Sequence, residues 1–369
     1  MSERPADLGF RWPAEWDEHA ATWIAWPHQR ADWPGKFAAI PWVFAEIVRH
    51  LHRSEPVGIL APTEAAVGRI RGLLARCGID LERVQLVVCP TDRCWLRDSG
   101  PIFVRSLTTG EVAVTAWGFN AWAKYVNWRL DAKVPDFMQR HLRLKGWRPC
   151  LGARRVVLEG GSIDGNGRGC LLTTEQCLLS DVQARNPGFR RQDYERVFAD
   201  YLGASKVLWL GRGIVGDDTH GHVDDVARFV GPRTVVAALE DDPRDDNYGP
   251  LRENFERLQG MADQEGRKLE VVPLPMPEPV WFAGQRLPAS YVNFYIANQC
   301  VLVPTFNDPR DRKALGILSE LFPERKVVGI HAVDLVWGLG TLHCLTQQQP
   351  LAGGLATPPA GGVATDGGV

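Results

Sequence analysis

The sequence lacks an excess of charge of either sign, because its 42 lysines and arginines are nearly balanced by 44 aspartates and glutamates. Such a balance gives no general attraction to nucleic acid or to an anionic membrane surface. Long apolar runs are also missing, since none reaches the roughly 20 residues that a membrane-spanning helix needs. We therefore expect neither a nucleic-acid partner nor a membrane segment.

Paired cysteine motifs are absent as well. The eight cysteines are scattered without Cys-x-x-Cys spacing, and the first residues contain no apolar stretch typical of an export signal. These absences argue against an exported protein stabilised by disulfides. We expect reduced thiols and a cytoplasmic location.

The chain has ample apolar material for a folded core. Of its 369 residues, 45% are hydrophobic, which is enough for one large core or two smaller ones. Fourteen tryptophans outnumber six tyrosines, and several of them fall within residues 12–42. Because indole rings bury a large apolar area, we expect most of them in the core, with an interface as the alternative use.

Short β-branched runs alternate with amphipathic stretches, which predicts an α/β protein. The predicted strands span residues 57–60, 84–89, 102–105, 112–116, 155–158, 207–210, 227–230, 235–239, 291–297, 301–304 and 326–330. The predicted helices span residues 63–76, 131–145, 191–202, 250–264 and 311–321. No internal linker divides the chain, so we expect one catalytic domain over residues 1–350. A low-complexity tail over 351–369 is expected to be flexible.

Polar side chains recur at the ends of predicted strands about every sixty residues. These positions are Asp98, Glu159, His222, Asn293 and Cys344. Such a period suggests radial repetition of a small strand and helix unit.

The densest group of ionisable side chains is the segment 217–225. If it formed a strand, His220, His222 and Asp224 would share one face, which suits metal ligation or a catalytic histidine and carboxylate pair. The segment is similar to the metal motif of metallo-β-lactamase-fold hydrolases, but Asp225 stands where the last histidine belongs. The simpler alternative is histidines satisfied by neighbouring carboxylates at a strand end.

Trp95 lies three residues before Asp98, and a turn follows directly. An indole face beside a carboxylate is a natural site for a planar cation such as guanidinium. The alternative is a surface ion pair of Arg97 with Asp98. Further along, Glu159 enters a glycine turn, where a ligand can approach the backbone closely.

Cys344 lies in a glycine-flanked segment near the C-terminus. Free cysteines are mostly buried structural thiols, but the glycines leave room for a substrate, and histidines and carboxylates elsewhere could activate a nucleophile. A run of acidic residues over 240–246 is expected to be a solvated loop, with attraction of cations to a nearby cleft as the alternative.

Taken in order, these segments resemble the agmatine deiminase family of pentein-fold, guanidine-modifying enzymes, which is related to the Porphyromonas-type peptidylarginine deiminases. The resemblance covers about residues 11–350. It is carried by five motifs, which are Pro13-Ala14-Glu15-Trp16 with Thr22-Trp23-Ile24-Ala25-Trp26-Pro27, Trp95-Leu96-Arg97-Asp98, Leu158-Glu159-Gly160-Gly161-Ser162, Gly221-His222-Val223-Asp224-Asp225 and His343-Cys344-Leu345-Thr346-Gln347-Gln348.

The resemblance implies a five-fold pseudosymmetric α/β propeller, the pentein fold, with the active site in a central channel. It also implies hydrolysis of agmatine to N-carbamoylputrescine and ammonia, on the route to putrescine, without metal or cofactor. By match of motif, Cys344 corresponds to the nucleophile and His222 to the general acid and base. Asp98 and Asp224 correspond to the carboxylates that bind guanidinium, and Glu159 to the one that assists the histidine.

The partner expected from the resemblance is a small cationic guanidine, in contact with Trp95, Asp98 and Asp224. Asp218 or the acidic loop 240–246 is expected to hold its distant amine. Three alternatives stay open: another small guanidine or a peptidyl arginine as substrate, a His/Asp metallohydrolase, and a guanidine-binding protein without turnover. A homodimer or a larger homo-oligomer is possible from the sequence.

Three residues depart from the usual family pattern. Leu339 and Thr341 replace a glycine and an asparagine before the nucleophile, and Asp164 stands in place of a histidine after the glycine turn. We expect all three beside the pocket, where they would affect the tail of the substrate more than the reaction.

Overall fold

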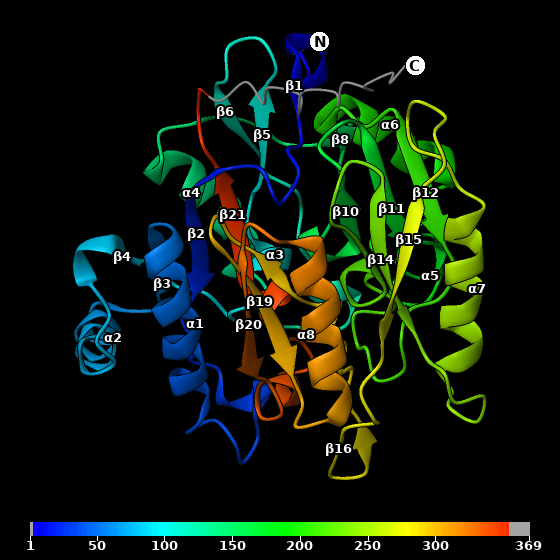
Figure 1. Ribbon diagram of the computed structural model, residues 1–369. Helices are drawn as coiled ribbons and strands as arrows, with labels where there is room; N and C mark the ends of the chain where they lie inside the picture. Colours follow the sequence, from blue (N-terminus) through cyan, green and yellow to red (C-terminus); the bar gives the residue numbers. More distant parts are fainter. Residues whose placement is uncertain (1–2, 354–369) are drawn as a thin grey trace, which may run out of the picture.

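The computed structural model describes residues 3–353, and it contains an α/β fold in which five sheets share one connectivity (Figure 1). In each of these sheets a strand pairs antiparallel with a second strand, which pairs parallel with a third. A helix lies between the second and third strands in sequence, as a parallel connection requires. The α/β class predicted from the sequence is therefore confirmed.

The five units follow one another in the chain order of their central strands. The first contains β21 (Thr346–Pro350), β2 (His19–Ala25), α1 (Ile40–Ser54) and β3 (Val57–Ala61), extended by α2 (Glu64–Arg76) and β4 (Val84–Val88). The second contains β5 (Ile102–Ser106), β6 (Val112–Thr115), α4 (Val134–His141) and β7 (Lys145–Trp147), with β1 (Phe10–Arg11) at its edge. The third contains β10 (Ile163–Gly165), β11 (Cys170–Thr174), α5 (Glu175–Leu179), α6 (Arg191–Leu202) and β12 (Lys206–Leu210). The fourth contains β13 (Ala227–Phe229), β14 (Thr234–Leu239), α7 (Tyr248–Gln259) and β15 (Glu270–Pro275). The fifth contains β18 (Tyr295–Ile296), β19 (Cys300–Thr305), α8 (Pro309–Leu321) and β20 (Lys326–His331).

Two small hairpins lie outside these units. They are β8 (Cys150–Leu151) with β9 (Arg154–Arg155), and β16 (Trp281–Phe282) with β17 (Gln285–Arg286). In Figure 1 the second hairpin projects at the lower end of the molecule.

Local sequence explains where the helices begin. The Thr63 hydroxyl accepts a hydrogen bond from the backbone N–H of Ala66 and so caps α2. Helix α8 has a capping box formed by Asp308 and Asp311, with Pro309 in its first turn. These are signals that a sequence shows directly, and both helices were predicted within two residues of their observed starts.

Other predicted boundaries are wrong. The helix predicted over 131–145 is a 3-10 turn followed by α4, which ends at His141 so that β7 can begin at Lys145. The strand predicted over 155–158 retains only β9 and one isolated bridge between Val157 and Gly118. The strand predicted over 291–297 shrinks to β18. Residues 240–246 form a loop, as predicted.

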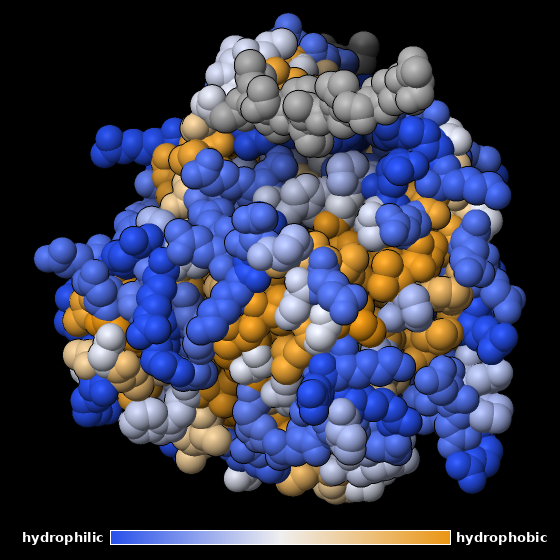
Figure 2. Space-filling model, viewed as in Figure 1, coloured by the Kyte–Doolittle hydropathy of each residue, from blue (hydrophilic) through white to orange (hydrophobic). Residues whose placement is uncertain are grey.

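Strand β21 joins the end of the described chain to its beginning. It pairs antiparallel with β2, so that Gln347 faces Trp23 across the sheet. Trp23 and Trp33 are fully buried, as expected for core tryptophans, but Trp42 is 55% exposed, so the expectation fails there. Figure 2 shows charged and polar side chains over most of one face, with apolar groups gathered near its centre.

Four one-turn helices precede first strands of the units and contact one another. They are α3 (Leu96–Ser99), η6 (Gly160–Ser162), η7 (Val223–Asp225) and α9 (Leu342–Leu345). Helix α3 contacts both α9 and η6, and η6 contacts η7. The segments that carry the predicted site residues therefore lie side by side.

None of the described helices combines the length and the apolar character needed to cross a membrane. All eight cysteines fall within the described residues and carry free thiols. Most of the predicted flexible tail, residues 354–369, lies outside the described part of the chain.

Candidate active site

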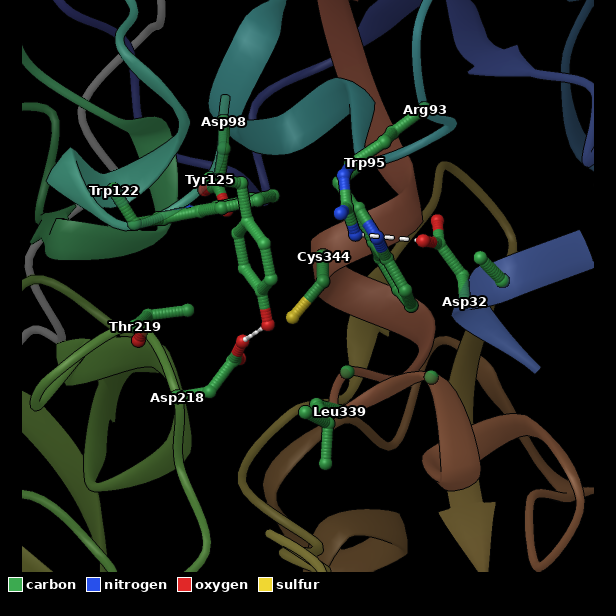
Figure 3. A pocket seen from close by; sticks show the side chains of 13 residues that line it. Asp32, Arg93, Trp95, Asp98, Trp122, Tyr125, Asp218, Thr219, Leu339 and Cys344 are labelled. Carbon is green, nitrogen blue, oxygen red and sulfur yellow. Dashed lines mark hydrogen bonds and ion pairs between the residues drawn. The ribbon is translucent and has the colours of Figure 1, made fainter. Parts of the chain in front are cut away.

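A cavity of about 100 Å³ opens where the one-turn helices meet (Figure 3). It is lined by Ala31, Asp32, Arg93, Trp95, Asp98, Trp122, Tyr125, Asp218, Thr219, Gly338, Leu339, Gly340 and Cys344. These residues come from distant parts of the sequence, and the sulfur of Cys344 points into the space between them (Figure 3).

Cys344 lies on α9 and is 7% exposed, at the floor of the cavity. The Asn293 side-chain amide donates a hydrogen bond to Sγ over 3.3 Å, and Oδ2 of Asp224 lies 3.9 Å from the same sulfur. Burial raises the pKa of the Cys344 thiol well above its ordinary value, and the nearby carboxylates raise it further. The thiol is therefore protonated in the free protein at neutral pH.

Gly340 leaves the space that the thiol and the tryptophan wall need. A β-carbon at this position would lie 2.8 Å from the Trp95 ring and 3.3 Å from Sγ of Cys344. The glycine before the cysteine was read from the sequence as room for a substrate, and its position agrees with that interpretation.

Asp98 lines the cavity from α3, and two donors fix its carboxylate. Trp122 Nε1 donates to Oδ2 over 2.9 Å, and the backbone N–H of Gly161 donates to Oδ1 over 3.0 Å. Burial raises the pKa of Asp98 to about 6, although the neighbouring His222 opposes the shift. The surface ion pair considered for Arg97 and Asp98 is wrong, because Arg97 is 2% exposed and donates to Gln348 and to the carbonyl of His343.

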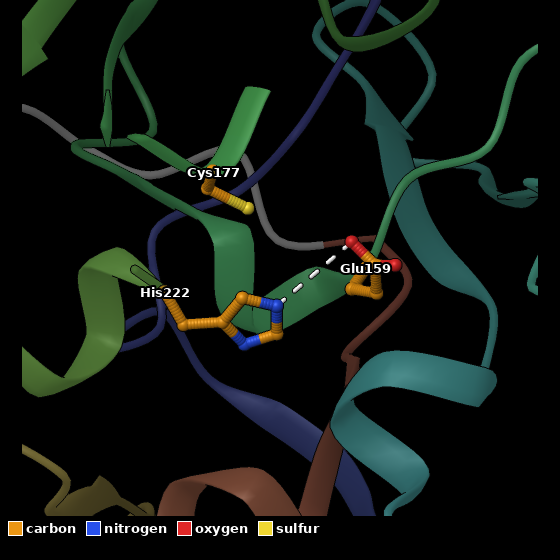
Figure 4. Close-up of side chains that lie close together, drawn as sticks. All are labelled: Glu159, Cys177 and His222. Carbon is orange, nitrogen blue, oxygen red and sulfur yellow. Dashed lines mark ion pairs between the residues drawn. The ribbon is translucent and has the colours of Figure 1, made fainter. Parts of the chain in front are cut away.

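His222 is almost completely buried between two carboxylates. Its Nδ1 lies 3.8 Å from Asp98 Oδ1, and its Nε2 lies 3.8 Å from Glu159 Oε2 (Figure 4). Burial alone would lower the pKa of His222, but Asp98, Glu159 and Asp224 outweigh that effect and raise it to about 9. The imidazole is therefore charged at neutral pH.

Glu159 is held by an arginine that sequence reasoning missed. Arg185 Nε lies 3.1 Å from Oε1 and 3.3 Å from Oε2 of Glu159, and the same guanidinium donates to the carbonyls of Gln183 and Thr219. Burial opposes ionisation, but Arg185 and His222 together hold the pKa of Glu159 below its ordinary value. Glu159 is therefore an oriented anion 3.8 Å from Nε2 of His222.

Gly161 lies at the point where three of the predicted residues converge. A β-carbon there would lie 2.6 Å from His222 Nδ1, 2.8 Å from Asp98 Oδ1 and 2.9 Å from Asp224 Oδ2. Asp224 also accepts a hydrogen bond from His343 Nδ1 over 2.6 Å. The chain therefore brings the His222 imidazole and the carboxylates of Asp98 and Asp224 around a single glycine.

The mouth of the cavity is built from two ion pairs. Tyr125 donates to Asp218 over 2.5 Å, with Lys124 at 3.4 Å from the same oxygen, and Arg93 donates to Asp32 over 2.6 Å. Burial raises the pKa of Asp218 and raises that of Asp32 to about 6. Asp218 therefore lines the same cavity as Cys344.

The acidic loop offers no such contact, because none of residues 240–246 lines the cavity. Two of its carboxylates pair instead with nearby arginines, Asp242 with Arg244 and Asp245 with Arg286. The prediction that this loop reaches the substrate's tail finds no support in the structure.

The metal set suggested by the sequence, His220 with His222 and Asp224, is wrong because the segment is not a strand. It forms turns followed by η7, and the His220 ring faces the Ser180 hydroxyl at 3.1 Å. Within the described residues, one group has the geometry to hold a metal ion, and it consists of Glu159, Cys177 and His222 (Figure 4). The fit is poor, because Arg185 already occupies Glu159 and burial raises the pKa of Cys177.

The three departures from the family pattern occupy different environments. Leu339 lines the cavity with a left-handed backbone, φ +68°. Thr341 donates to Asn293 Oδ1 over 2.6 Å and so holds the amide that contacts Cys344. Asp164 was expected beside the pocket, but it does not line the cavity. It pairs instead with the buried Arg228 and accepts a hydrogen bond from the backbone N–H of Phe229.

Comparison with known proteins agrees with this arrangement. The model of the Porphyromonas-type peptidyl-arginine deiminase family matches residues 11–350. The agmatine deiminase of Pseudomonas aeruginosa (strain LESB58) is 36% identical, over 94% of this chain and 97% of that protein.

Solved structures give the same picture. The agmatine deiminase of Enterococcus faecalis superposes with a TM-score of 0.86 at 31% identity, over 95% of this chain and 98% of that chain. A substrate-bound agmatine deiminase of C. jejuni superposes with a TM-score of 0.82 at 27% identity, over 93% of this chain and 97% of that chain. The chain shares their α/β fold, and it belongs to the Porphyromonas-type peptidyl-arginine deiminase family.

Proposed function

We propose that this chain is an agmatine deiminase, which hydrolyses the guanidinium group of agmatine to give N-carbamoylputrescine and ammonia. The observation that carries the proposal is the position of Cys344 in a small cavity, with Asp98 lining the same cavity and Asp224 at 3.9 Å from the sulfur. A thiol beside fixed carboxylates suits attack on a bound planar cation.

The guanidinium of the substrate, protonated at any physiological pH, would be held by Asp98 and Asp224. Carboxylates on two edges of a guanidinium accept its N–H groups and fix the central carbon in front of the sulfur. Trp95 would supply the flat wall along one face of the cation. Trp122 and Gly161 keep Asp98 oriented before the substrate arrives.

Binding of the cation would also activate the nucleophile. Burial and surrounding anions raise the pKa of Cys344 in the empty site, and a bound positive charge opposes that shift and favours the thiolate. The charged His222 works in the same direction. Substrate binding and formation of the nucleophile are then coupled, which protects the thiol when no substrate is present.

The reaction follows from these positions in two halves. Cys344 loses its thiol proton to solvent, and its sulfur forms a bond to the guanidinium carbon. His222 gives its proton to the departing nitrogen, so that the C–N bond breaks, ammonia leaves and a thiouronium remains on the cysteine. Neutral His222 then takes a proton from water, whose oxygen attacks the same carbon. The C–S bond breaks as the hydroxyl proton of the adduct returns to the sulfur, and the neutral ureido product leaves. Glu159, fixed by Arg185, orients the imidazole and stabilises its charged form.

The mouth of the cavity favours a small linear substrate over a peptidyl arginine. The cavity holds about 100 Å³ and is bordered by the Asp32–Arg93 and Tyr125–Asp218 pairs, which leave room for a thin aliphatic tail. Asp218 would receive the terminal ammonium of agmatine. A polypeptide would require these pairs to separate.

For the whole fold, we propose a five-fold pseudosymmetric propeller with the site in its central channel. The shared connectivity of the five units supports this arrangement. Helices α7 and α8 each contact their own sheet and a strand of the neighbouring unit, as blades of a ring would. A cytoplasmic location fits a small, polar metabolic substrate.

The test is an assay of ureido product and ammonia with agmatine, arginine and an arginine-containing peptide. We expect the highest kcat/KM for agmatine, and no product from Cys344→Ala, which should still bind agmatine. Ammonia release by Cys344→Ala would contradict the nucleophile assignment. Faster turnover of the peptide would overturn the substrate assignment, and the absence of turnover with all three would overturn the enzymatic function.

A further inference from the structure

A buried row of alternating charges leads away from the proposed active site. His343 Nδ1 lies 2.6 Å from Asp224 Oδ2, and His343 Nε2 lies 2.9 Å from Glu15 Oε2. Glu15 in turn lies 2.9 Å from Arg228, whose guanidinium also pairs with Asp164. All five side chains are less than a tenth exposed, so water screens these contacts little.

The geometry fixes the charge of His343. Both of its ring nitrogens face carboxylate oxygens, which accept hydrogen bonds and donate none when ionised. Burial opposes ionisation of both carboxyl groups, but besides His343 the Arg228 cation lowers the pKa of Glu15, and His222 and Arg228 lower that of Asp224. With both acceptors ionised, a proton on each ring nitrogen satisfies both contacts, and this is the geometry of an imidazolium.

Glu15 is anchored far more firmly than a charge partner for one histidine requires. Its Oε1 accepts from the backbone N–H of Ile296 over 2.8 Å, and Arg97 lies 3.3 Å from Oε2. The residue lies just before β2 and is separated from His343 by 328 positions. It does not line the cavity and contacts no reacting atom.

From this arrangement we propose that Glu15 is a positioning residue for the deiminase reaction: it keeps His343 charged, and His343 keeps Asp224 ionised and oriented toward the cavity. The role in turnover rests on the proposed function, whereas the charge of His343 does not. Asp224 Oδ2, the atom that accepts the hydrogen bond from His343, is also the oxygen 3.9 Å from the sulfur of Cys344. Glu15 is therefore connected to the neighbourhood of Cys344 through two contacts of one side chain, the imidazole of His343.

The sign of the effect follows from the charges around Asp224. His222, His343 and Arg228 face it as cations, and the carboxyl group of Asp98 lies on the same side. Burial raises the pKa of the neighbouring Asp225 well above its ordinary value, and the thiol of Cys344 is uncharged. In Glu15→Gln the ring of His343 loses the anion that holds its second proton. The positive charge lost is that of the His343 ring, 2.6 Å from Asp224, and the negative charge lost is that of Glu15, on the other side of the ring. Because the nearer charge has the larger effect, the pKa of Asp224 rises.

The first measurement is the pH dependence of kcat/KM for agmatine in the full-length protein. Glu15→Gln should raise the pKa of Asp224 by about 1 to 3 units, the range that an opposite charge within hydrogen-bonding distance imposes on an aspartate. A second ionisation then joins the acid limb that Asp98, with its pKa of about 6, sets in the unsubstituted protein, so the limb should become steeper and shift upward. His343→Gln should move it in the same direction, because the amide can still donate to Asp224 but carries no charge.

The second measurement needs no substrate. In protein labelled with ¹⁵N-histidine, the His343 signals, assigned by their loss in His343→Gln, should show both ring nitrogens protonated at pH 7. In Glu15→Gln one nitrogen should lose its proton.

The matched control is Glu55→Gln. Glu55 pairs with His19 over 2.9 Å in an equally buried setting and has no contact with Asp224. Its loss should lower the melting temperature without moving the acid limb or the His343 signals.

A singly protonated His343 in the unsubstituted protein would overturn the proposal. So would an acid limb unchanged in both midpoint and steepness in Glu15→Gln and His343→Gln, because residue 15 would then have a purely structural role. If no guanidine is turned over, the deiminase function fails, and the ¹⁵N spectra still decide whether Glu15 sets the charge of His343.

Discussion

Gly161→Ala tests whether the three groups around this glycine act together. The added methyl carbon would lie 2.6 Å from His222 Nδ1, 2.8 Å from Asp98 Oδ1 and 2.9 Å from Asp224 Oδ2, all well inside the separations of ordinary van der Waals contact. Gly161 does not have a positive φ, so its backbone tolerates alanine. The substitution therefore acts by displacing side chains and leaves the backbone unstrained.

The size of the effect follows from the required displacement. At least one of the three groups must move by several tenths of an ångström, and errors of about 1 Å in the placement of reacting groups cost about 100-fold in rate. We expect kcat/KM for agmatine to fall by about 100-fold, which corresponds to about 2.7 kcal/mol of lost transition-state stabilisation. Overpacking at a buried site should also lower the free energy of unfolding, by about 1–3 kcal/mol.

The assay is ammonia release at saturating and limiting agmatine, combined with thermal unfolding. Gly316→Ala is the control, because Gly316 lies within α8 and a β-carbon there meets no atom within 4 Å. Alanine should stabilise that helix by roughly 0.5–1 kcal/mol and leave kcat/KM unchanged. Wild-type kcat/KM in a folded Gly161→Ala protein would refute the convergence of these groups on one substrate.

Four further outcomes follow from the site. Asp98→Asn should lower kcat/KM about 10- to 100-fold by removing a charged acceptor for guanidinium, and an unchanged value would remove Asp98 from the site. Asp218→Asn should raise KM for agmatine about tenfold with little change in kcat. An equal fall in kcat and in kcat/KM would instead place Asp218 in the chemical step. Leu339→Gly relieves a left-handed backbone at φ +68° and enlarges the cavity. The melting temperature should therefore change little, while kcat/KM for bulkier guanidines should rise relative to that for agmatine. An unaltered ratio would contradict a role of Leu339 in selecting the substrate's tail. The pKa of His222 is raised to about 9 from its ordinary value near 6.5, so the stability that its charge contributes should be full below about pH 6.5 and lost as pH rises through about 9. The basic limb of kcat/KM should likewise lie near 9; pH profiles of kcat/KM and of melting check this, and a basic limb near 7 would contradict it.

The site illustrates why some local predictions from sequence fail. Residues 217–225 alternate in a way that suits a strand, but Asp217 accepts hydrogen bonds from the backbone N–H groups of Gly221 and His222 and folds the segment into a turn. Such side-chain to backbone bonds compete with strand pairing. The segment 155–158 likewise has strand-forming residues, but only Arg155 pairs within a hairpin, and Val157 makes one isolated bridge with Gly118.

The sequence by itself determined the α/β class and the starts of the capped helices, and its motifs singled out Trp95, Asp98 and Cys344, which the structure places around one cavity. Those features depend on short-range patterns, such as a capping threonine or a glycine beside a cysteine. Only the tertiary structure decided which of these groups are charged. Glu15 reaches His343 across 328 positions and Asp224 reaches it across 119, and no local pattern reports such neighbours. Protonation depends on burial and on charges a few ångströms away in space, and these distances exist only once the chain has folded.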